Sequence, residues 1–372
     1  MGSSQGLYNA LFSYLRTVHP AAHVTRISNW VWIVVGMILS HSVQLSKVAE
    51  HIPSEAKAAG RIQQIRRWLS NQFIHPIEFY RPLISQVLSH WVGQDVYVLL
   101  DATSVNGTKF QILRTALSHA FRALPLSWLV IDGPGQVKVE DAEALLLETQ
   151  HLLTSVAGIT LVADRGFRDS DWAERCLKLG WNYLIRVANN SMIYLADGRC
   201  VSVADLGVKP GQTGFFPTVS YTRKGFACQL MVTWTTATPK QPAELCAVIT
   251  NLPPCSKNLR AYLKRMHVEE GFRDDKSGCC QLEKTKLRDP ERLNHLLLAY
   301  SIVILWAHHL GQQTWQSKQR KQVDPAAQRQ LSIFQIGWRS LQRAISCGRF
   351  PPFSLCIRPM RLALVAVKHR KC

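Results

Sequence analysis

Apolar residues recur at helical spacing through the first 92 residues, and polar breaks separate the apolar runs. In residues 60–74 the apolar side chains share one helical face, and four polar residues lie outside it: Arg61, Gln64, Arg66 and Arg67. The pattern predicts an all-helical N-terminal domain over 1–92. Its arginines could contact phosphates, or they could belong to an ordinary amphipathic surface helix.

From Asp95 the pattern changes to short β-rich runs mixed with helical ones. Strands are expected over 96–105, 110–121, 124–133, 159–167 and 182–187, and helices over 139–156 and 170–180. This order is typical of a mixed sheet flanked by helices, so the predicted fold class is α/β. A β-rich insertion is expected over about 188–252, followed by a charged helix and an apolar helix that complete a central domain over 93–310. Residues 311–372 resemble a looser basic segment.

Three features bear on the compartment. The most apolar runs, Trp30 to Leu39 and Leu296 to Ala307, are shorter than the roughly 20 residues that cross a bilayer, so they are interpreted as buried helices. The first residues show no basic stretch followed by an apolar core, which argues against export. The ten cysteines form no CxxC pair, so a disulfide framework is not expected. We therefore expect a cytoplasmic protein with no membrane partner.

Charge indicates the kind of partner. Lys and Arg number 44 against 25 Asp and Glu, which gives a net charge of +19 and favours a polyanion, with nucleic acid first. The segment from Gln312 to Cys372 contains twelve basic residues and a single acidic residue, Asp324. An anionic membrane surface is the alternative target for this segment. Interleaved aromatic residues favour nucleic acid.

Two aspartates follow apolar strand-like runs: Asp101 comes after VYVLL and Asp164 after ITLVA. A carboxylate there is costly unless it is paired or binds a cation. If the strands are neighbours, the carboxylates lie close together, and Mg²⁺ is the hard cation that such oxygen ligands hold. Either aspartate could instead cap a turn or pair with an arginine. Other acids compete for the role: Asp132, Asp169, Asp171, Glu270, Asp274 and Asp275.

The charged helix presents a stripe of selected side chains. At about 100° per residue, five residues fall within roughly 80° of one another: Tyr262, Arg265, Glu269, Arg273 and Lys276. The stripe therefore shows a carboxylate flanked by cations. A solvated face with i,i+4 ion pairs, such as Glu269 with Arg273, is the simpler interpretation.

The spacing of Tyr262, Arg265, Glu269 and Lys276 resembles the Y-x2-R-x3-E-x6-K signature of the insertion sequence four (IS-four) family of bacterial DDE transposases. DATS and VADRG are similar to that family's first and second aspartate motifs. The similarity runs from about Asp95 to Leu310, with weaker agreement in the N-terminal helices. One difference is Met266, where the family often has tryptophan.

The resemblance implies a ribonuclease H-like core in which Asp101, Asp164 and Glu269 are catalytic and hold two Mg²⁺ ions, with Mn²⁺ as a substitute. It also implies in-line displacement at phosphorus during cut-and-paste transposition. Tyr262, Arg265 and Lys276 would grip DNA phosphates. Arg273 shares their stripe and is added as a candidate, as are Arg61, Arg66 and Arg67 of the N-terminal domain.

The partners that the resemblance implies are double-stranded DNA, as terminal inverted repeats and target, and a second copy of the chain in a synaptic homodimer. The compartment would be the bacterial cytoplasm, in association with the nucleoid. Trp234 is a candidate for stacking on a flipped base, although a core role is the commoner fate of such a residue. A repurposed nuclease and a catalytically inactive DNA-binding protein of the same fold remain alternatives, and a glycosidase is a remote one.

Overall fold

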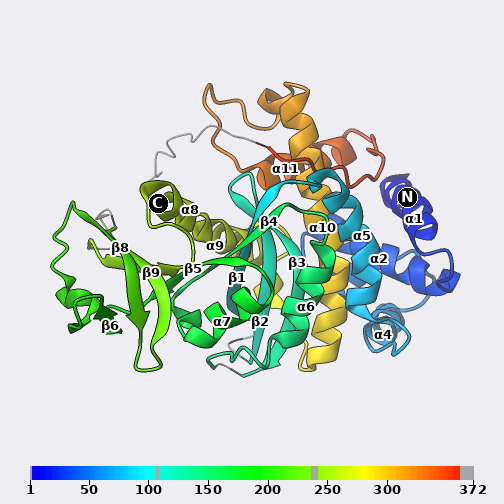
Figure 1. Cartoon of the computed structure of the whole chain (residues 1–372). Coiled ribbons are helices and arrows are strands. Elements are labelled where there is room, and N and C mark those ends of the chain that lie inside the picture. The colour runs from blue at the N-terminus through cyan, green and yellow to red at the C-terminus, as the bar shows by residue number, and fades with distance from the viewer. Residues whose placement is uncertain (1, 106, 108, 134, 236–241, 361–372) are drawn as a thin grey trace.

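The computed structural model describes residues 2–105, 107, 109–133, 135–235 and 242–360. Its centre is one mixed ten-stranded sheet with the strand order β3-β2-β1-β4-β5-β10-β9-β8-β6-β7 (Figure 1). The strands are β1 Asp95–Val105, β2 Phe110–His119, β3 Arg122–Asp132, β4 Gly158–Ala163, β5 Asn182–Val187, β6 Met192–Leu195, β7 Cys200–Ser202, β8 Thr213–Tyr221, β9 Phe226–Trp234 and β10 Leu245–Thr250. Strands β1, β4 and β5 are parallel, whereas β1, β2 and β3 pair antiparallel. The predicted mixed α/β class is confirmed.

Eleven α-helices accompany the sheet in the described residues. They are α1 Gly2–Val18, α2 Val24–Ser40, α3 Leu45–Ala49, α4 Ala58–Leu69, α5 Pro76–Leu88, α6 Glu143–Leu152, α7 Ser170–Lys178, α8 Ser256–Tyr262, α9 Met266–Arg273, α10 Pro290–Gln316 and α11 Ile333–Ser346. Helices α2, α4, α5 and α11 all contact α10, which itself packs on β3. Helix α10 is therefore the element that these four helices share as a packing partner.

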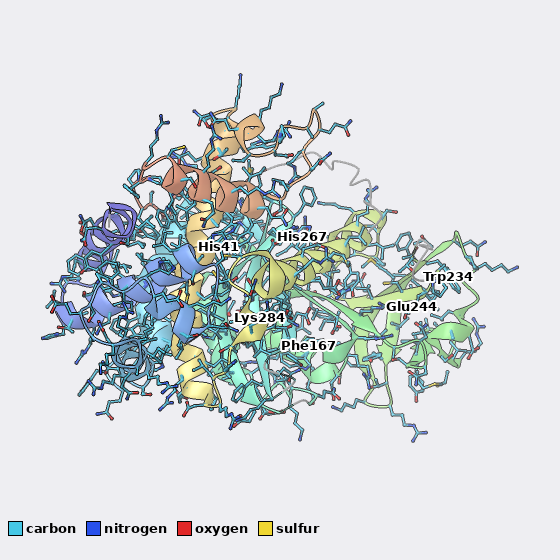
Figure 2. All side chains as sticks on the ribbon, turned by 180° about the vertical axis from the view of Figure 1, so that it is seen from behind. His41, Phe167, Trp234, Glu244, His267 and Lys284 are labelled. Atoms are coloured by element: carbon cyan, nitrogen blue, oxygen red, sulfur yellow. The ribbon has the colours of Figure 1, made fainter. Side chains whose placement is uncertain are left out.

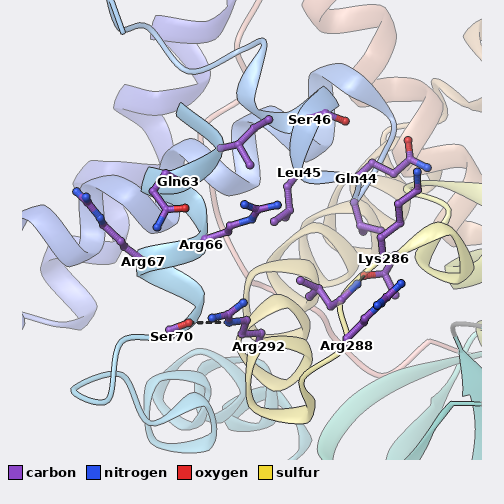
Figure 3. Close-up of a pocket in the computed structure, with 14 residues that line it drawn as sticks. Gln44, Leu45, Ser46, Gln63, Arg66, Arg67, Ser70, Lys286, Arg288 and Arg292 are labelled. Carbon is purple, nitrogen blue, oxygen red and sulfur yellow. Dashed lines mark hydrogen bonds between the residues drawn. The ribbon is translucent and has the colours of Figure 1, made fainter. Parts of the chain in front are cut away.

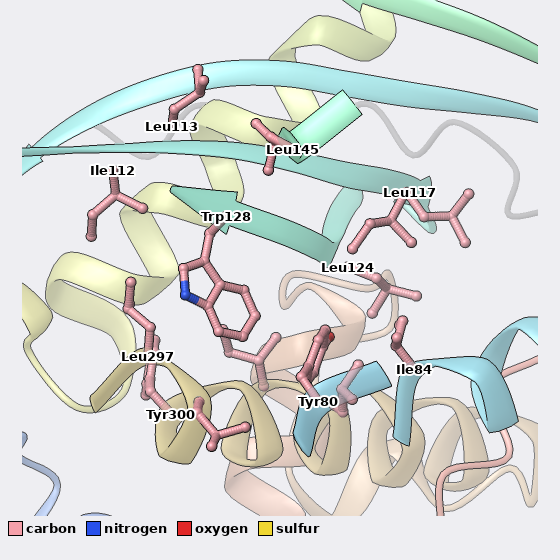
Figure 4. Packing of buried hydrophobic residues seen from close by; sticks show 14 of the residues in the cluster. Tyr80, Ile84, Ile112, Leu113, Leu117, Leu124, Trp128, Leu145, Leu297 and Tyr300 are labelled. Carbon is pink, nitrogen blue, oxygen red and sulfur yellow. The ribbon is translucent and has the colours of Figure 1, made fainter. Parts of the chain in front are cut away.

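The N-terminal helices and the sheet share one hydrophobic core. Tyr80 of α5 lies against Trp128 of β3, with ring centroids 5.0 Å apart, and Leu297 and Tyr300 of α10 lie in the same cluster (Figure 4). The polar ends of both aromatic residues are satisfied, since the Tyr80 hydroxyl donates to the Pro125 carbonyl and Trp128 Nε1 donates to Asn294. The helices before β1 are therefore packed onto the sheet through apolar contacts.

Strand β10 falls within the range expected for a β-rich insertion, yet it pairs antiparallel with β5 and continues the central sheet. All six of its residues are buried, as the unbroken apolar run LCAVIT requires of a strand covered on both faces. Strands β6 to β9 extend the same sheet to the side away from the N-terminal helices (Figure 1).

Helix α10 runs for 27 residues and is therefore longer than its apolar run predicted. By length and composition alone it could cross a membrane, but 89% of its most apolar 18-residue window is buried inside the protein. It is the core helix of this fold. The domain boundary expected at residue 310 falls inside it.

The segment after α10 is not a loose appendage where the structure describes it. Helix α11 begins with a capping box between Ser332 and Gln335 and packs along α10. Gly311 and Gly337 permit the close approach, since a Cβ on either would lie within 3.0 Å of backbone atoms of the other helix. Of the twelve basic residues in this segment, four lie outside the described residues: Arg361, Lys368, Arg370 and Lys371.

Candidate active site

Sheet register places Asp101 and Asp164 side by side. Leu100 and Ala163 are the last paired residues of the parallel strands β1 and β4, and the two aspartates follow them. Asp164 comes directly after β4. Asp101 lies within its strand, because β1 continues to Val105, as the expected strand over 96–105 predicts, and pairs there with its other neighbour, β2, in which Arg114 is the partner of Asp101.

One pocket of about 560 Å³ brings the two aspartates together with the charged helix. Its charged lining residues are Asp101, Asp164, Arg265, Glu269, Arg273, Lys276 and Glu283. Glu283 was missed by sequence reasoning, because nothing in its surroundings distinguishes it from a surface glutamate. The pocket therefore combines four acids, which come from β1, the residue after β4, α9 and the 3₁₀ turn over Leu282–Lys284, with three cations.

The acids in the pocket repel one another. Burial raises the pKa of Asp101 to about 6, and the nearby carboxylates of Asp164 and Glu269 add to the rise. The backbone N–H of Ala102, 2.8 Å from Asp101 Oδ1, and the guanidinium of Arg265 oppose it. An ionised Asp101 is thus costly here, and a cation is what would offset the cost.

Each of the three acids has a protein partner. Glu269 Oε1 lies 2.6 Å from Arg265 Nη1, and Asp164 Oδ1 accepts a hydrogen bond from the Gly166 N–H at 2.7 Å. The i,i+4 pair suggested between Glu269 and Arg273 is wrong, because Arg273 pairs with Glu270 at 2.6 Å. Glu270 points away from Glu269, as helical geometry predicts.

A divalent cation would suit the chemistry of these ligands, which are all carboxylate oxygens. In the described residues, however, no three His, Cys, Asp or Glu side chains converge on a point that could hold a metal ion. The Glu269 carboxylate forms an ion pair with Arg265 instead. A cation held by Asp101 and Asp164 would therefore compete with the Arg265 guanidinium for Glu269.

The charged helix is not one continuous α-helix. A 3₁₀ turn over Leu263–Arg265 joins α8 to α9, and a π turn over Asp274–Gly278 follows α9. Arg265, Glu269, Arg273 and Lys276 still line one pocket, but Tyr262 does not. Its side chain is buried in a small cluster with Val162 and Leu184, and its hydroxyl has no hydrogen-bond partner among the described residues.

Most of the competing acids belong to other ion pairs. Asp169 and Asp171 pair with Lys224, Asp274 with Arg122, and Asp275 with Arg114. Glu270 contacts both Arg122 and Arg273. Asp132 is the last residue of β3 and lines a different pocket. None of the six lines the pocket that contains Asp101.

A buried pair anchors the π turn that carries Lys276. Arg114 Nη1 lies 2.8 Å from Asp275 Oδ2, the Tyr300 hydroxyl donates to the same carboxylate, and the Arg114 guanidinium stacks over the Phe272 ring. Arg114 and Asp275 are only 7% and 6% exposed. Sequence reasoning missed this partnership because 161 residues separate the two.

We expect Asp275→Ala to lower the free energy of unfolding by about 3–5 kcal/mol, because it leaves the Arg114 charge buried and unpaired. Chemical denaturation would measure the change. Asp197→Ala, which removes an exposed carboxylate paired with Arg199, is the matched control and should leave the midpoint unchanged. Equal midpoints for both variants would contradict the anchoring role.

The remaining candidates lie elsewhere. Trp234 closes β9 in the sheet extension (Figure 2), where its Nε1 donates to the Val208 carbonyl at 2.8 Å and its ring packs against the core. These contacts favour the structural interpretation of Trp234. Arg66 and Arg67 line a second pocket, whereas Arg61 does not and has a buried Nε without a partner among the described residues.

Comparison with known proteins gives one family. The model of the family described as "Transposase DDE domain" matches residues 93–306, more than half of the chain. A search of curated proteins finds no match. Among solved structures, an Argonaute from Marinitoga piezophila in complex with a 5′ OH guide RNA aligns at 10% identity and a TM-score of 0.27, over 67% of this chain and 38% of the Argonaute. At that score the alignment supports no further conclusion.

Proposed function

Because the chain belongs to the DDE transposase family, we propose that it is a transposase of the IS-four type, acting on the ends of an insertion sequence by cut-and-paste transposition. It would cleave phosphodiester bonds there and join the freed 3′-hydroxyl ends to target DNA. The observation that carries the proposal is the pocket that Asp101, Asp164 and Glu269 line together with three cations. The family's DDE domain implies a ribonuclease H-like fold for the central domain.

Asp101, Asp164 and Glu269 are the proposed catalytic acids. DDE transposases generally use divalent metal ions, and we propose two Mg²⁺ ions here, with Mn²⁺ able to replace them. Asp101, Asp164 and Glu269 would hold these ions, which would supply Lewis-acid activation of the attacking oxygen and charge stabilisation at the departing oxygen. The protein itself would supply the carboxylate oxygen ligands, from three different elements of the fold. Asp101, with its raised pKa, is the acid that gains most when a cation offsets the repulsion.

Arg265, Arg273 and Lys276 are the proposed phosphate contacts at the cleaved end. They line the same pocket as the acids, and a guanidinium can hold a phosphate through two parallel hydrogen bonds. Arg265 would have two states, one paired with Glu269 and one turned to DNA. Tyr262 stays a weaker candidate, because its buried hydroxyl could reach DNA only after a local rearrangement.

The proposed partners are double-stranded DNA and a second copy of the chain in a synaptic homodimer, in a bacterial cytoplasm. Residues 1–92 and the basic segment after 310 would share DNA contacts and dimer contacts with the central domain. The alternative is a catalytically inactive or repurposed DNA-binding protein of the same fold. The acids lining the pocket disfavour it, because clustered carboxylates carry a cost that a non-catalytic scaffold has no need to retain.

Incubation of the purified full chain with a labelled duplex carrying the ends of its own element tests this function. We expect site-specific cleavage with Mg²⁺ or Mn²⁺ and none with a chelator. Binding of the ends without cleavage, under conditions in which paired-end complexes are verified, would favour the inactive DNA-binding protein. Cleavage that persists in chelator would exclude the metal-dependent mechanism.

A further inference from the structure

A second groove, of about 650 Å³, lies between α4 and the segment that leads into α10 (Figure 3). Cations approach it from two sides. Arg66 and Arg67 come from α4, and the facing wall carries Lys286, Arg288 and Arg292. The groove shares no lining residue with the active-site pocket. It is therefore a separate feature of the surface.

The positive charge of this groove is not neutralised. Within the described chain, no Asp or Glu lines it, and none of its five cations takes part in a salt bridge. Arg292 donates to the Ser70 hydroxyl at 2.8 Å, while Arg66, Arg67, Lys286 and Arg288 are exposed. Like charges gathered on facing walls repel one another, so this arrangement favours an anion between them.

The hydrogen bond between Arg292 and Ser70 joins the start of α10 to the end of α4, and further hydrogen bonds fix the segment before α10 against other parts of the fold. The Val43 N–H donates to the Cys280 carbonyl at 2.8 Å, and the Gln44 side chain donates to the Lys284 carbonyl at 3.4 Å. The Arg288 carbonyl accepts from Lys109 Nζ at 2.8 Å. The groove is thus built before any ligand arrives, which lowers the entropic cost of binding.

The lining also indicates which anion would bind. It contains no Trp, Tyr or Phe among the described residues, and its apolar part is aliphatic: Val43, Leu45, Ile62 and Leu287. Single-stranded nucleic acid is usually held by bases stacked on aromatic rings, which this groove does not offer. A duplex presents a continuous row of phosphates and needs cations alone for sequence-independent binding.

The groove lies beside the active site along the chain. Glu283 lines the active-site pocket, and Lys286, three residues later, lines the groove. Three residues span at most about 11 Å, which is close to the rise of three base pairs. We propose that this groove binds the phosphate backbone of duplex DNA within a few base pairs of the bond that the active site cleaves. The position relative to the cleaved bond rests on the proposed function.

The test is duplex binding by the full chain in chelator, measured by fluorescence anisotropy over a range of salt concentrations. Variants Arg66→Gln and Lys286→Gln remove one cation from each wall, singly and together. Lys178→Gln with Lys209→Gln is the matched control, since both lysines are exposed and line neither site. Unfolding midpoints of all variants would establish that each is folded.

We expect the double variant to bind a duplex of unrelated sequence roughly tenfold more weakly, with a log–log salt slope reduced by about 2. The control should keep the wild-type slope. An unchanged slope in the double variant would overturn the proposal, as would an equal loss with a single-stranded oligonucleotide. Displacement of the duplex by inorganic phosphate at matched ionic strength would indicate a small-anion site and would overturn it too.

These outcomes are independent of catalysis. If the protein binds duplex through the groove but never cleaves DNA with Mg²⁺, the proposed function fails and the backbone site stands. If cleavage is normal and the double variant binds like the wild type, the groove proposal fails alone. A cleavage position that shifts in the double variant, with its rate kept, would support the placement beside the cleaved bond.

Discussion

Glu269→Gln is expected to lower the rate of DNA end cleavage by about 1,000-fold or more while DNA binding persists. Glutamine keeps the length and shape of the side chain but removes the negative charge, so the pocket loses one of its four carboxylates, and one of the three proposed to be catalytic. Removal of a single charge-stabilising group from an active site commonly costs two to three orders of magnitude or more in rate. The assay is single-turnover cleavage of a labelled element end in Mg²⁺.

Stability should change little in this variant. Glu269 is 40% exposed, and an ion pair at such a position contributes at most about 1 kcal/mol. Glu270→Gln is the matched control, because it removes a neighbouring carboxylate that faces Arg122 and Arg273 outside the acidic cluster. Comparable cleavage rates for the two variants would show that Glu269 has no special role.

Gly337→Ala should have the largest effect on folding. A Cβ at Gly337 would lie within 3.0 Å of backbone atoms of Ala307 and Gly311, and no side-chain rotation can relieve a clash with backbone. Helices α10 and α11 would have to separate, which opens the core that both helices bury. We expect a loss of about 3 kcal/mol or more in the free energy of unfolding.

Denaturant unfolding of Gly337→Ala would be compared with that of Gly135→Ala. A Cβ at Gly135 meets no atom within 4 Å, so that control should unfold like the wild type. If Gly337→Ala is too unstable to purify, the fraction of soluble protein for the two variants gives the same comparison. A wild-type midpoint for Gly337→Ala would mean that α11 does not pack on α10 as described.

The sheet and the meeting of its two aspartates could be predicted from sequence because the signal is local. Apolar runs that end in a carboxylate mark buried strands, and adjacent parallel strands place their ends together. Asp101 and Asp164 follow the last β1–β4 pair for that reason. Helical spacing likewise predicted that Arg265 and Glu269 point to the same side, because the two residues are about one helical turn apart.

The features that could not be predicted from the sequence depend on contacts between residues far apart in the chain. Residues 245–250 were expected in the insertion, but they form β10, which pairs with β5 and belongs to the central sheet. The Arg114–Asp275 ion pair joins β2 to the π turn. The burial of Tyr262 follows from packing against the sheet, which its place in the motif does not reveal. The length of α10 exceeded its apolar run because capping by Asp289 and polar residues at both ends extend the helix.

The most direct measurement is strand transfer by the wild-type chain. Duplexes carrying the element ends would be incubated with a supercoiled target plasmid and Mg²⁺, and the products would be mapped by sequencing. We expect plasmid molecules joined to the 3′-hydroxyl ends of the element, and no joining when the duplex ends carry a 3′-dideoxy nucleotide. Cleaved ends that never join, even when supplied already cut, would contradict the assignment of this chain as a transposase.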